Sequence, residues 1–171
     1  MKPVNIALIG MPGCGKTSIG KEAAFICGLA FLDTDAMIEE RYGKIPELFK
    51  NGEAYFREIE TQVIRQAASA QNAVISTGGG SILKEENMAA LKEFGMVVYI
   101  NRPLEKILSD IDDTERPLIK GKSHRLIELY KDRKALYEKY ADFTVLNGQT
   151  HEKAVQDLIG YIKENLEKME F

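Results

Sequence analysis

The 171-residue sequence has little cysteine, no long apolar run and no excess of basic residues. Its two cysteines, Cys14 and Cys27, are too few for a disulfide framework and indicate a reducing compartment. No apolar run approaches the length of about 18 residues that a membrane span requires, and the first ten residues have no cleavable signal pattern. The 23 basic and 26 acidic side chains give a net charge of −3, which argues against a nucleic-acid surface. We therefore expect a cytoplasmic protein with no membrane or nucleic-acid partner.

Short apolar runs alternate with helical patterns along the whole chain, and no repeat, low-complexity tract or linker divides it. The runs typical of strands are residues 4–9, 30–33, 73–77, 96–101 and 143–146. The segments predicted to be helical are residues 16–28, 36–43, 45–70, 87–95, 103–111, 124–141 and 152–169. Apolar strands separated by helices imply a parallel sheet covered on both faces. We expect one domain, residues 1–171, with three layers (α/β/α) and a five-stranded parallel sheet.

Unusual residues follow three of the predicted strands. The first strand is followed by glycines and Lys16, the second by two aspartates, and the third by the run Gly78–Gly80. Parallel α/β sheets bind ligands at the carboxyl ends of their strands. The sequence therefore predicts that these three loops share one rim of the sheet and form a binding site.

The first of these loops, IGMPGCGKTS, contains a phosphate-binding motif. The residues that match G-x-x-x-x-G-K-[ST] are Gly10, Gly15, Lys16 and Thr17. Glycines there let successive backbone N–H groups form an anion nest at a helix N-terminus. Lys16 would reach the outer phosphates, and Thr17 would offer its hydroxyl to Mg²⁺. The alternative is an ordinary glycine turn with a solvent-exposed lysine, but a strand before the loop and a helix after it favour nucleotide binding. The further loop residues assigned to the nucleotide are Gly13, Cys14 and Ser18.

Cys14 has a second expected property. A thiol at a helix N-terminus is often reactive, so we expect alkylating reagents to inactivate the protein and bound nucleotide to protect it.

Two aspartates follow the second predicted strand, in FLDTDAMIE. A phosphate loop alone leaves GTPases, ATPases and small-molecule kinases open, although the chain has no N-K-x-D guanine signature and is short for a motor ATPase. Asp33 and Asp35 are two residues apart in a segment predicted to be extended, so their side chains would point to the same side. Such a pair could serve Mg²⁺ and a substrate hydroxyl. The alternative is a helix N-cap, at Asp35 or Thr34, beside a solvated acid.

Three further groups have both an ordinary and a functional interpretation. Arg57 and Glu60, in YFREIE, are three residues apart on a predicted helix, where a surface ion pair is common. The run Gly78–Gly80 could be a flexible turn, but three glycines lose much backbone entropy on folding. Arg133 and Tyr137 lie one helical turn apart, where a solvated helix face is the simpler interpretation.

Together these stretches resemble the shikimate kinase family. GMPGCGKTS, FLDTDAMIE, FREIE, STGGG, RPLI and RKALYEKYA occur in the order, and near the spacing, of that family over nearly the whole chain. The resemblance implies ATP-dependent phosphorylation of the 3-hydroxyl of shikimate, a step towards chorismate and the aromatic amino acids. It also implies a P-loop kinase fold with the strand order 2-3-1-4-5, ATP as co-substrate and Mg²⁺ as the metal. We expect the protein to be a monomer.

The resemblance further implies a role for each matching residue. Lys16 and Thr17 would serve the phosphates and Mg²⁺, and Asp33 the metal and its waters. Asp35 would hold the hydroxyls of shikimate and accept the transferred proton, in a substrate-binding segment of about residues 33–60. Arg57 and Arg133 would bind the substrate carboxylate. Gly78, Gly79 and Gly80 would contact the substrate, with a backbone N–H donated by Gly79. Arg116 would take part in catalysis and bind the ATP phosphates, and Gln149 would contact adenine.

The predicted lid, about residues 109–122, departs from the family pattern. Related lids usually carry a further arginine before the R-P-L sequence, and this one does not. It holds four acids instead, Asp110, Asp112, Asp113 and Glu115. Acids near a triphosphate are unfavourable, so we expect weaker ATP affinity than in relatives with two lid arginines.

Two alternatives remain open at this point. One is another small P-loop kinase, acting on gluconate or a nucleoside monophosphate. The other is a regulator that binds ATP as a signal and transfers nothing.

Overall fold

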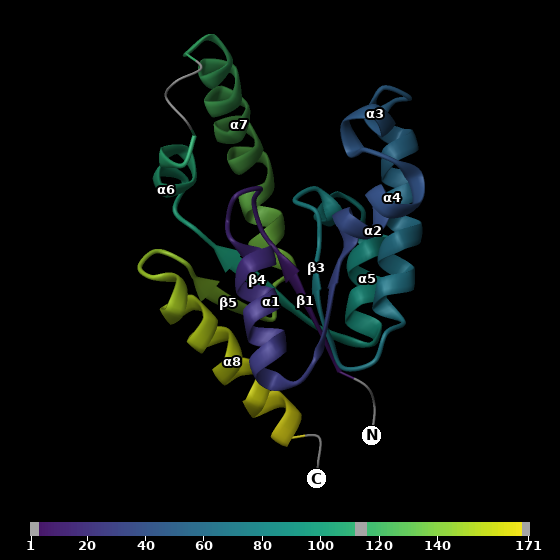
Figure 1. Cartoon of the computed structure of the whole chain (residues 1–171), viewed down its shortest axis with the longest axis vertical. Coiled ribbons are helices and arrows are strands. Elements are labelled where there is room, and N and C mark those ends of the chain that lie inside the picture. Colours follow the sequence, from purple (N-terminus) through teal and green to yellow (C-terminus); the bar gives the residue numbers. More distant parts are fainter. Residues whose placement is uncertain (1–3, 112–115, 169–171) are drawn as a thin grey trace.

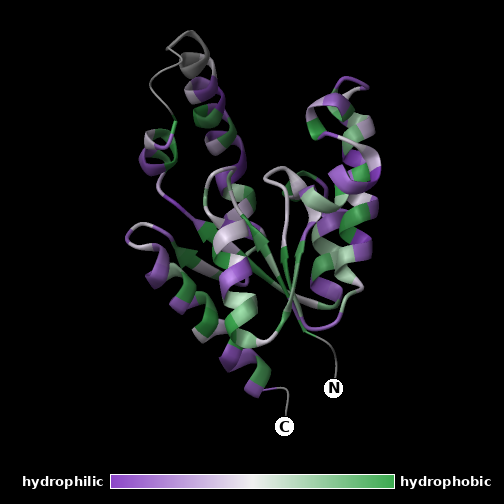
Figure 2. Ribbon diagram, in the orientation of Figure 1, coloured by the Kyte–Doolittle hydropathy of each residue, from purple (hydrophilic) through white to green (hydrophobic). Residues whose placement is uncertain are grey.

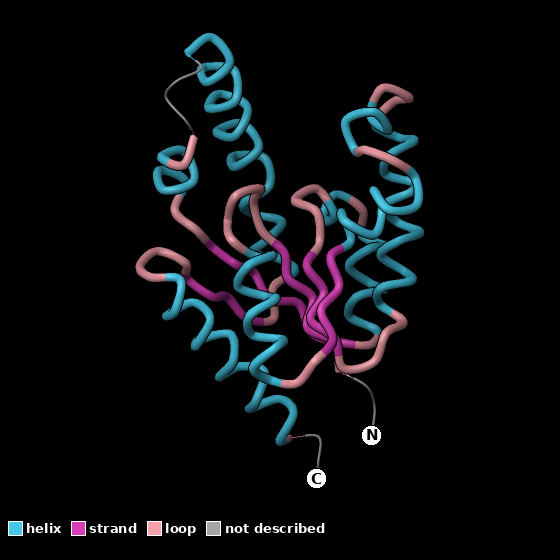
Figure 3. The backbone as a smooth tube through the Cα atoms, viewed as in Figure 1, coloured by secondary structure: helices cyan, strands magenta, loops and turns pink. Residues whose placement is uncertain are grey.

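The protein is built around a parallel sheet with helices on both sides (Figure 1, Figure 3). The computed structural model describes residues 4–111 and 116–168, and for residues 116–120 it describes the backbone alone. The strands are β1 (Asn5–Ile9), β2 (Ala30–Asp33), β3 (Ala73–Ser76), β4 (Gly95–Asn101) and β5 (Phe143–Leu146). The helices are α1 (Lys16–Cys27), α2 (Thr34–Tyr42), α3 (Ile45–Phe49), α4 (Glu53–Ala68), α5 (Glu85–Glu93), α6 (Leu104–Ser109), α7 (Arg116–Tyr140) and α8 (His151–Glu167), with a short 3₁₀ helix η1 (Ser81–Leu83).

The sheet confirms the expected architecture. Its order is β2-β3-β1-β4-β5, and every neighbouring pair is parallel. β1 lies at the centre, with Ala7 paired to Ile75 of β3 and to Val97 of β4. Because all strands run in the same direction, their carboxyl ends lie at one edge of the sheet, where α3 and the start of α7 rise above them (Figure 1).

The core lies on both faces of the sheet. Every residue of β1 and β3 is buried, and the strands form the most hydrophobic part of the ribbon (Figure 2). α1 packs along α8 on one side of the sheet, and α4 packs along α5 on the other. Continuous apolar strands in a doubly covered sheet stabilise the fold through the hydrophobic effect. No helix in the described part of the chain is long and apolar enough to cross a membrane.

Two of the predicted helices differ from those observed. The segment 45–70 forms two helices, α3 and α4, because Gly52 adopts φ 104° between them as the N-cap of α4. Glycine tolerates this left-handed region at no steric cost, and it interrupts the helical hydrogen bonds. The helix predicted to begin at His124 begins already at Arg116, so residues 116–122 of the expected lid are helical.

Candidate functional site

The phosphate loop leads from the end of β1 into the N-terminus of α1. Gly15 is the N-cap of α1 and adopts φ 91°. A Cβ atom at this position would lie 2.9 Å from the side-chain nitrogen of Asn147, so both the backbone angle and the space require glycine. The Lys16 side chain is only 8% exposed, and its Nζ donates to the Met11 carbonyl at 3.3 Å. The loop therefore presents an ammonium group and the free end of a helix at the same place.

Cys14 is held inside this loop rather than at its surface. Its side chain is fully buried, and its carbonyl accepts a hydrogen bond of 2.9 Å from Asn147. A Cβ atom on Gly10 would lie 2.8 Å from the Cys14 Sγ, which shows how tightly the thiol is covered. The expectation that alkylating reagents attack Cys14 is therefore wrong for this fold, because a reagent does not reach a fully buried sulfur.

Three side-chain oxygens meet beside the phosphate loop. The Thr17 hydroxyl donates to Asp33 Oδ2 at 3.2 Å and lies 3.2 Å from the Ser76 hydroxyl. They come from α1, β2 and β3 respectively. Asp33 also caps α2, since its Oδ1 accepts from the Ala36 N–H at 3.1 Å. The cap fixes the carboxylate so that its other oxygen faces Thr17.

Asp35 does not lie in an extended segment, as the sequence suggested, but in the first turn of α2. The N-cap is Asp33 rather than Asp35 or Thr34. Burial raises the pKa of the Asp35 carboxyl, and the neighbouring Asp33 charge adds to the rise. The charges of Lys16 and Arg57 act in the opposite direction on the same carboxyl. Asp35 is thus within reach of the charges of both the phosphate-loop lysine and an arginine of α4.

The glycine run after β3 is closely packed on every side. A Cβ atom on Gly78 would lie 2.8 Å from Asp35 Oδ1, and one on Gly79 would lie 2.8 Å from Pro12 Cδ of the phosphate loop. A Cβ atom on Gly80 would clash with the Arg57 guanidinium. Because a Cβ atom on each glycine would meet a different neighbour, the run is a packing surface for the site and not a flexible turn.

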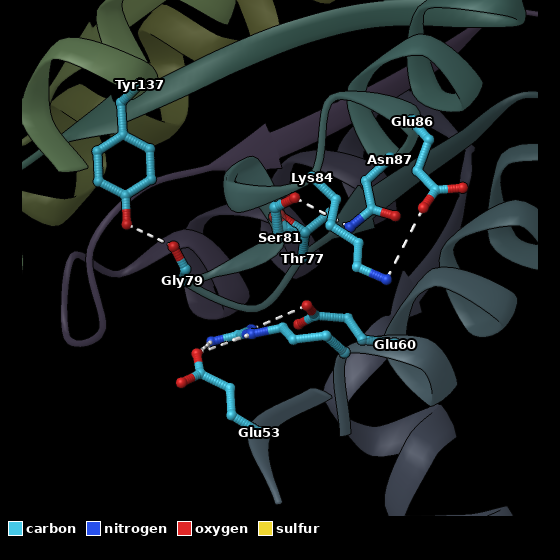
Figure 4. Close-up of polar contacts among 10 residues, drawn as sticks. Glu53, Glu60, Thr77, Gly79, Ser81, Lys84, Glu86, Asn87 and Tyr137 are labelled. Carbon is cyan, nitrogen blue, oxygen red and sulfur yellow. Dashed lines mark hydrogen bonds and ion pairs between the residues drawn. The ribbon is translucent and has the colours of Figure 1, made fainter. Parts of the chain in front are cut away.

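Arg57 and Glu60 form a buried ion pair, so the surface pair that their spacing suggested is wrong. The Glu60 side chain is 1% exposed and that of Arg57 is 12% exposed. Arg57 Nη1 donates to Glu60 Oε1 at 2.9 Å, and its Nε donates to Glu53 Oε1 at 3.4 Å; both glutamates are labelled in Figure 4. Burial raises the pKa of Glu60, opposed by the charges of Arg57 and Arg133. Arg133 is itself buried and its charge also acts on Glu60, so we refer to Arg57, Glu60 and Arg133 as the charged group beneath the glycine run.

A hollow of about 590 Å³ lies beside the phosphate loop. Its lining includes Gly13, Gly15, Ser18, Arg102, Asn147 and Gln149. Gln149 therefore lines a hollow that it shares with residues of the phosphate loop. Of the predicted lid residues, Asp112, Asp113 and Glu115 lie outside the described residues, as does the side chain of Arg116.

Some residues of this arrangement were not identified from the sequence. Ser76, Pro12 and Arg102 were not singled out, and Tyr137, expected on a solvated face, is fully buried. Ser76 is a polar residue at the end of an otherwise apolar strand, and this pattern is a signal from which it could have been predicted as a site residue. Arg102 carries no such signal, because its contact with the phosphate loop depends on how β4 and α6 are placed.

The fold and the site together define a P-loop protein with a second, charged site beside its phosphate loop. The family model for shikimate kinase matches residues 12–163. The chain belongs to the shikimate kinase family, which confirms the resemblance seen in its motifs.

Individual relatives agree with this assignment. The shikimate kinase of Clostridium botulinum (strain Eklund 17B / Type B) is 46% identical over 159 residues, which cover 92% of this chain and 94% of the relative. The structure of shikimate kinase from Acinetobacter baumannii in complex with shikimate matches with a TM-score of 0.82 at 37% identity, covering 97% of this chain and 93% of that one. A gluconokinase from Sinorhizobium meliloti 1021 matches with a TM-score of 0.66 at 18% identity over 99% of both chains, a likeness of fold alone.

Proposed function

We propose that this chain is a kinase that transfers the γ-phosphoryl group of ATP to the 3-hydroxyl of shikimate, a step towards the aromatic amino acids. The observation that carries the proposal is the placement of Asp35. It lies against the glycine run, where the charges of Lys16 and Arg57 both act on its carboxylate. A donor phosphate on Lys16 and an acceptor hydroxyl on Asp35 would then be neighbours.

The phosphate loop would hold ATP. Lys16 would neutralise the outer phosphates, and the backbone of the loop with the α1 N-terminus would bind their oxygens. The base would occupy the hollow beside Gln149. The other residues assigned to ATP are Gly13, Cys14, Gly15, Thr17, Ser18 and Arg116. Phosphoryl transfer needs positioning and charge neutralisation more than a strong base.

The oxygens beside the loop fit Mg²⁺. The Thr17 hydroxyl and the Asp33 carboxylate are hard oxygen ligands, and Mg²⁺ is usually held by few such protein groups together with phosphates and waters. Bound there, Mg²⁺ would neutralise charge that develops on the phosphates. The Ser76 hydroxyl holds Thr17 in place from the strand side.

The charged group beneath the glycine run would bind the acceptor. Arg57 and Arg133 would grip the carboxylate of shikimate, because guanidinium groups match carboxylates with paired hydrogen bonds. Glu60 holds Arg57 in a fixed orientation. Gly79, between Gly78 and Gly80, would donate a backbone N–H to the substrate. Asp35 would orient the reacting hydroxyl and accept its proton.

This activity would belong to one domain, acting as a monomer in the cytoplasm. Residues 33–60 would form the acceptor segment and residues 109–122 the lid. The partners would be shikimate and ATP, with no nucleic acid or membrane.

The direct test is an ADP-release assay with a panel of acceptors. We expect rapid ADP release with shikimate and little with gluconate, nucleoside monophosphates or no acceptor. Faster release with gluconate or a nucleotide would favour the other P-loop kinases. Nucleotide binding without acceptor-dependent ADP release would point to a regulator.

A second prediction concerns Arg102, a basic side chain that lines the hollow beside the phosphate loop. Arg102 donates to the Gly13 carbonyl at 3.0 Å and forms an ion pair with Asp110. The hydrogen bond from Arg102 to Asp110, together with the Arg102 charge, lowers the pKa of Asp110. We expect Arg102→Ala to raise the KM for ATP by about three- to tenfold, because a charge-assisted contact to the loop is lost. Steady-state kinetics at saturating shikimate measure it.

The partner acid supplies the complementary variant. Asp110→Asn frees the guanidinium, so the KM for ATP is expected to fall. Equal KM values in both variants and the wild type would remove Arg102 from the nucleotide site.

A further inference from the structure

The glycine run Gly78–Gly80 has no side chains of its own to hold it, although the proposed acceptor site depends on it. Neighbouring carbonyls are bonded within the turn: Gly78 accepts from the Ser81 N–H and Gly80 from the Leu83 N–H, both at 3.1 Å. The Gly79 carbonyl is held differently, by a residue of α7. The Tyr137 hydroxyl donates to it at 2.6 Å, and Figure 4 shows the phenol directed at this oxygen.

This hydrogen bond fixes the orientation of one peptide unit. The peptide bond is planar, so holding the Gly79 carbonyl also fixes the N–H of Gly80 on the opposite side. Glycine visits both signs of φ readily, and an untethered Gly79–Gly80 peptide could rotate. The Arg57 guanidinium packs against Gly80, so a rotation of this peptide would disturb an arginine of the proposed acceptor site.

Tyr137 is suited to hold this position because it is itself immobile. Its side chain is fully buried, and its ring stacks on that of Tyr99 with centroids 5.2 Å apart. Burial raises the pKa of Tyr137 to about 12, so its hydroxyl keeps the proton that it donates. Arg133 lies one helical turn earlier, and its charge acts on the same hydroxyl. The phenol thus lies between a proposed carboxylate-binding arginine and the glycine run.

We propose that Tyr137 is a positioning residue of the acceptor site, which orients the Gly79–Gly80 peptide and Arg133 relative to each other. The inference rests on the proposed function, because it predicts an effect on the binding of the acceptor shikimate and not on the binding of ATP. It predicts that the hydroxyl of Tyr137, and not its ring, sets the affinity for the acceptor.

Two matched variants test this inference. Tyr137→Phe removes the hydroxyl and keeps the ring. Tyr99→Phe removes the hydroxyl of the stacked partner ring, which bonds to Asn101 and not to the glycine run. We expect Tyr137→Phe to lower kcat/KM for shikimate by about tenfold, mainly through KM, because one buried carbonyl loses its donor. The KM for ATP is expected to stay at the wild-type value, and Tyr99→Phe is expected to leave both constants unchanged. Thermal unfolding of both variants measures their stability separately.

The opposite results are equally distinct. If both variants lose stability alike and keep wild-type kcat/KM for shikimate, Tyr137 is only a core residue and the inference is overturned. A rise in the KM for ATP alone would also overturn it. If the wild-type protein prefers another acceptor of the panel, the proposed function fails. The same comparison is then made on that acceptor, where unchanged kinetics for Tyr137→Phe would overturn the inference.

Discussion

Replacing Lys16 with methionine is expected to abolish turnover while leaving shikimate binding measurable. Lys16 is 8% exposed at the start of α1, and its ammonium lies over the phosphate loop. Phosphoryl transfer depends on groups placed in advance to neutralise charge, and loss of one such group lowers kcat by about 10²- to 10³-fold. Methionine keeps an unbranched chain of similar length, so the buried stem is still filled. ADP release measures the rate, and calorimetric titration with shikimate measures the acceptor site.

The control is a lysine outside the site. Lys153 lies on α8, half exposed, and pairs with Asp157. Lys153→Met is expected to behave as the wild type in both measurements. Turnover of Lys16→Met at the wild-type rate would contradict the assignment of the phosphate loop, and loss of shikimate binding in the same variant would indicate that the acceptor site had been disturbed.

Replacing Asp35 with asparagine is expected to lower kcat and to raise stability. The carboxylate would orient the reacting hydroxyl and accept its proton, a contribution of about 10²-fold or more. In the folded protein, burial and Asp33 raise the pKa of Asp35, so the native state binds this proton more tightly than the unfolded chain. At pH values above the raised pKa, the buried carboxylate is charged and lowers the free energy of unfolding. At neutral pH the uncharged amide of asparagine removes this destabilisation. We expect a lower kcat together with a higher Tm.

The pH profile provides a second measurement on Asp35. As pH falls through its raised pKa, the carboxylate is protonated, so wild-type kcat is expected to fall on the acid side. The Asp35→Asn variant is expected to have a lower kcat that does not fall further on the acid side. Asp132→Asn, at an exposed position of α7, serves as the control. An Asp35→Asn variant with the wild-type rate and the wild-type acid decline would exclude Asp35 from the chemistry.

The residue pattern alone was enough to predict the sheet and the phosphate loop. Short apolar runs, glycine clusters and the G-x-x-x-x-G-K-[ST] spacing are local properties, so β1–β5 and the start of α1 were predicted within a residue or so. The helix break at Gly52 was missed, because glycine within a helical pattern is often tolerated and only its φ of 104° shows that it ends one helix and begins the next.

Motifs at the strand ends also predicted where the candidate site lies, because parallel strands bring their carboxyl ends to one edge. The charges of Lys16 and Arg57 both act on the Asp35 carboxyl there. Burial was decided by the tertiary structure. Spacing on a helix places Glu60 beside Arg57 and Tyr137 beside Arg133, but whether such a face meets water or protein depends on elements that are distant in sequence. The packing of α4 and α7 against the glycine run buries these side chains, and the same contact places the ion pair and the tyrosine beside the candidate site.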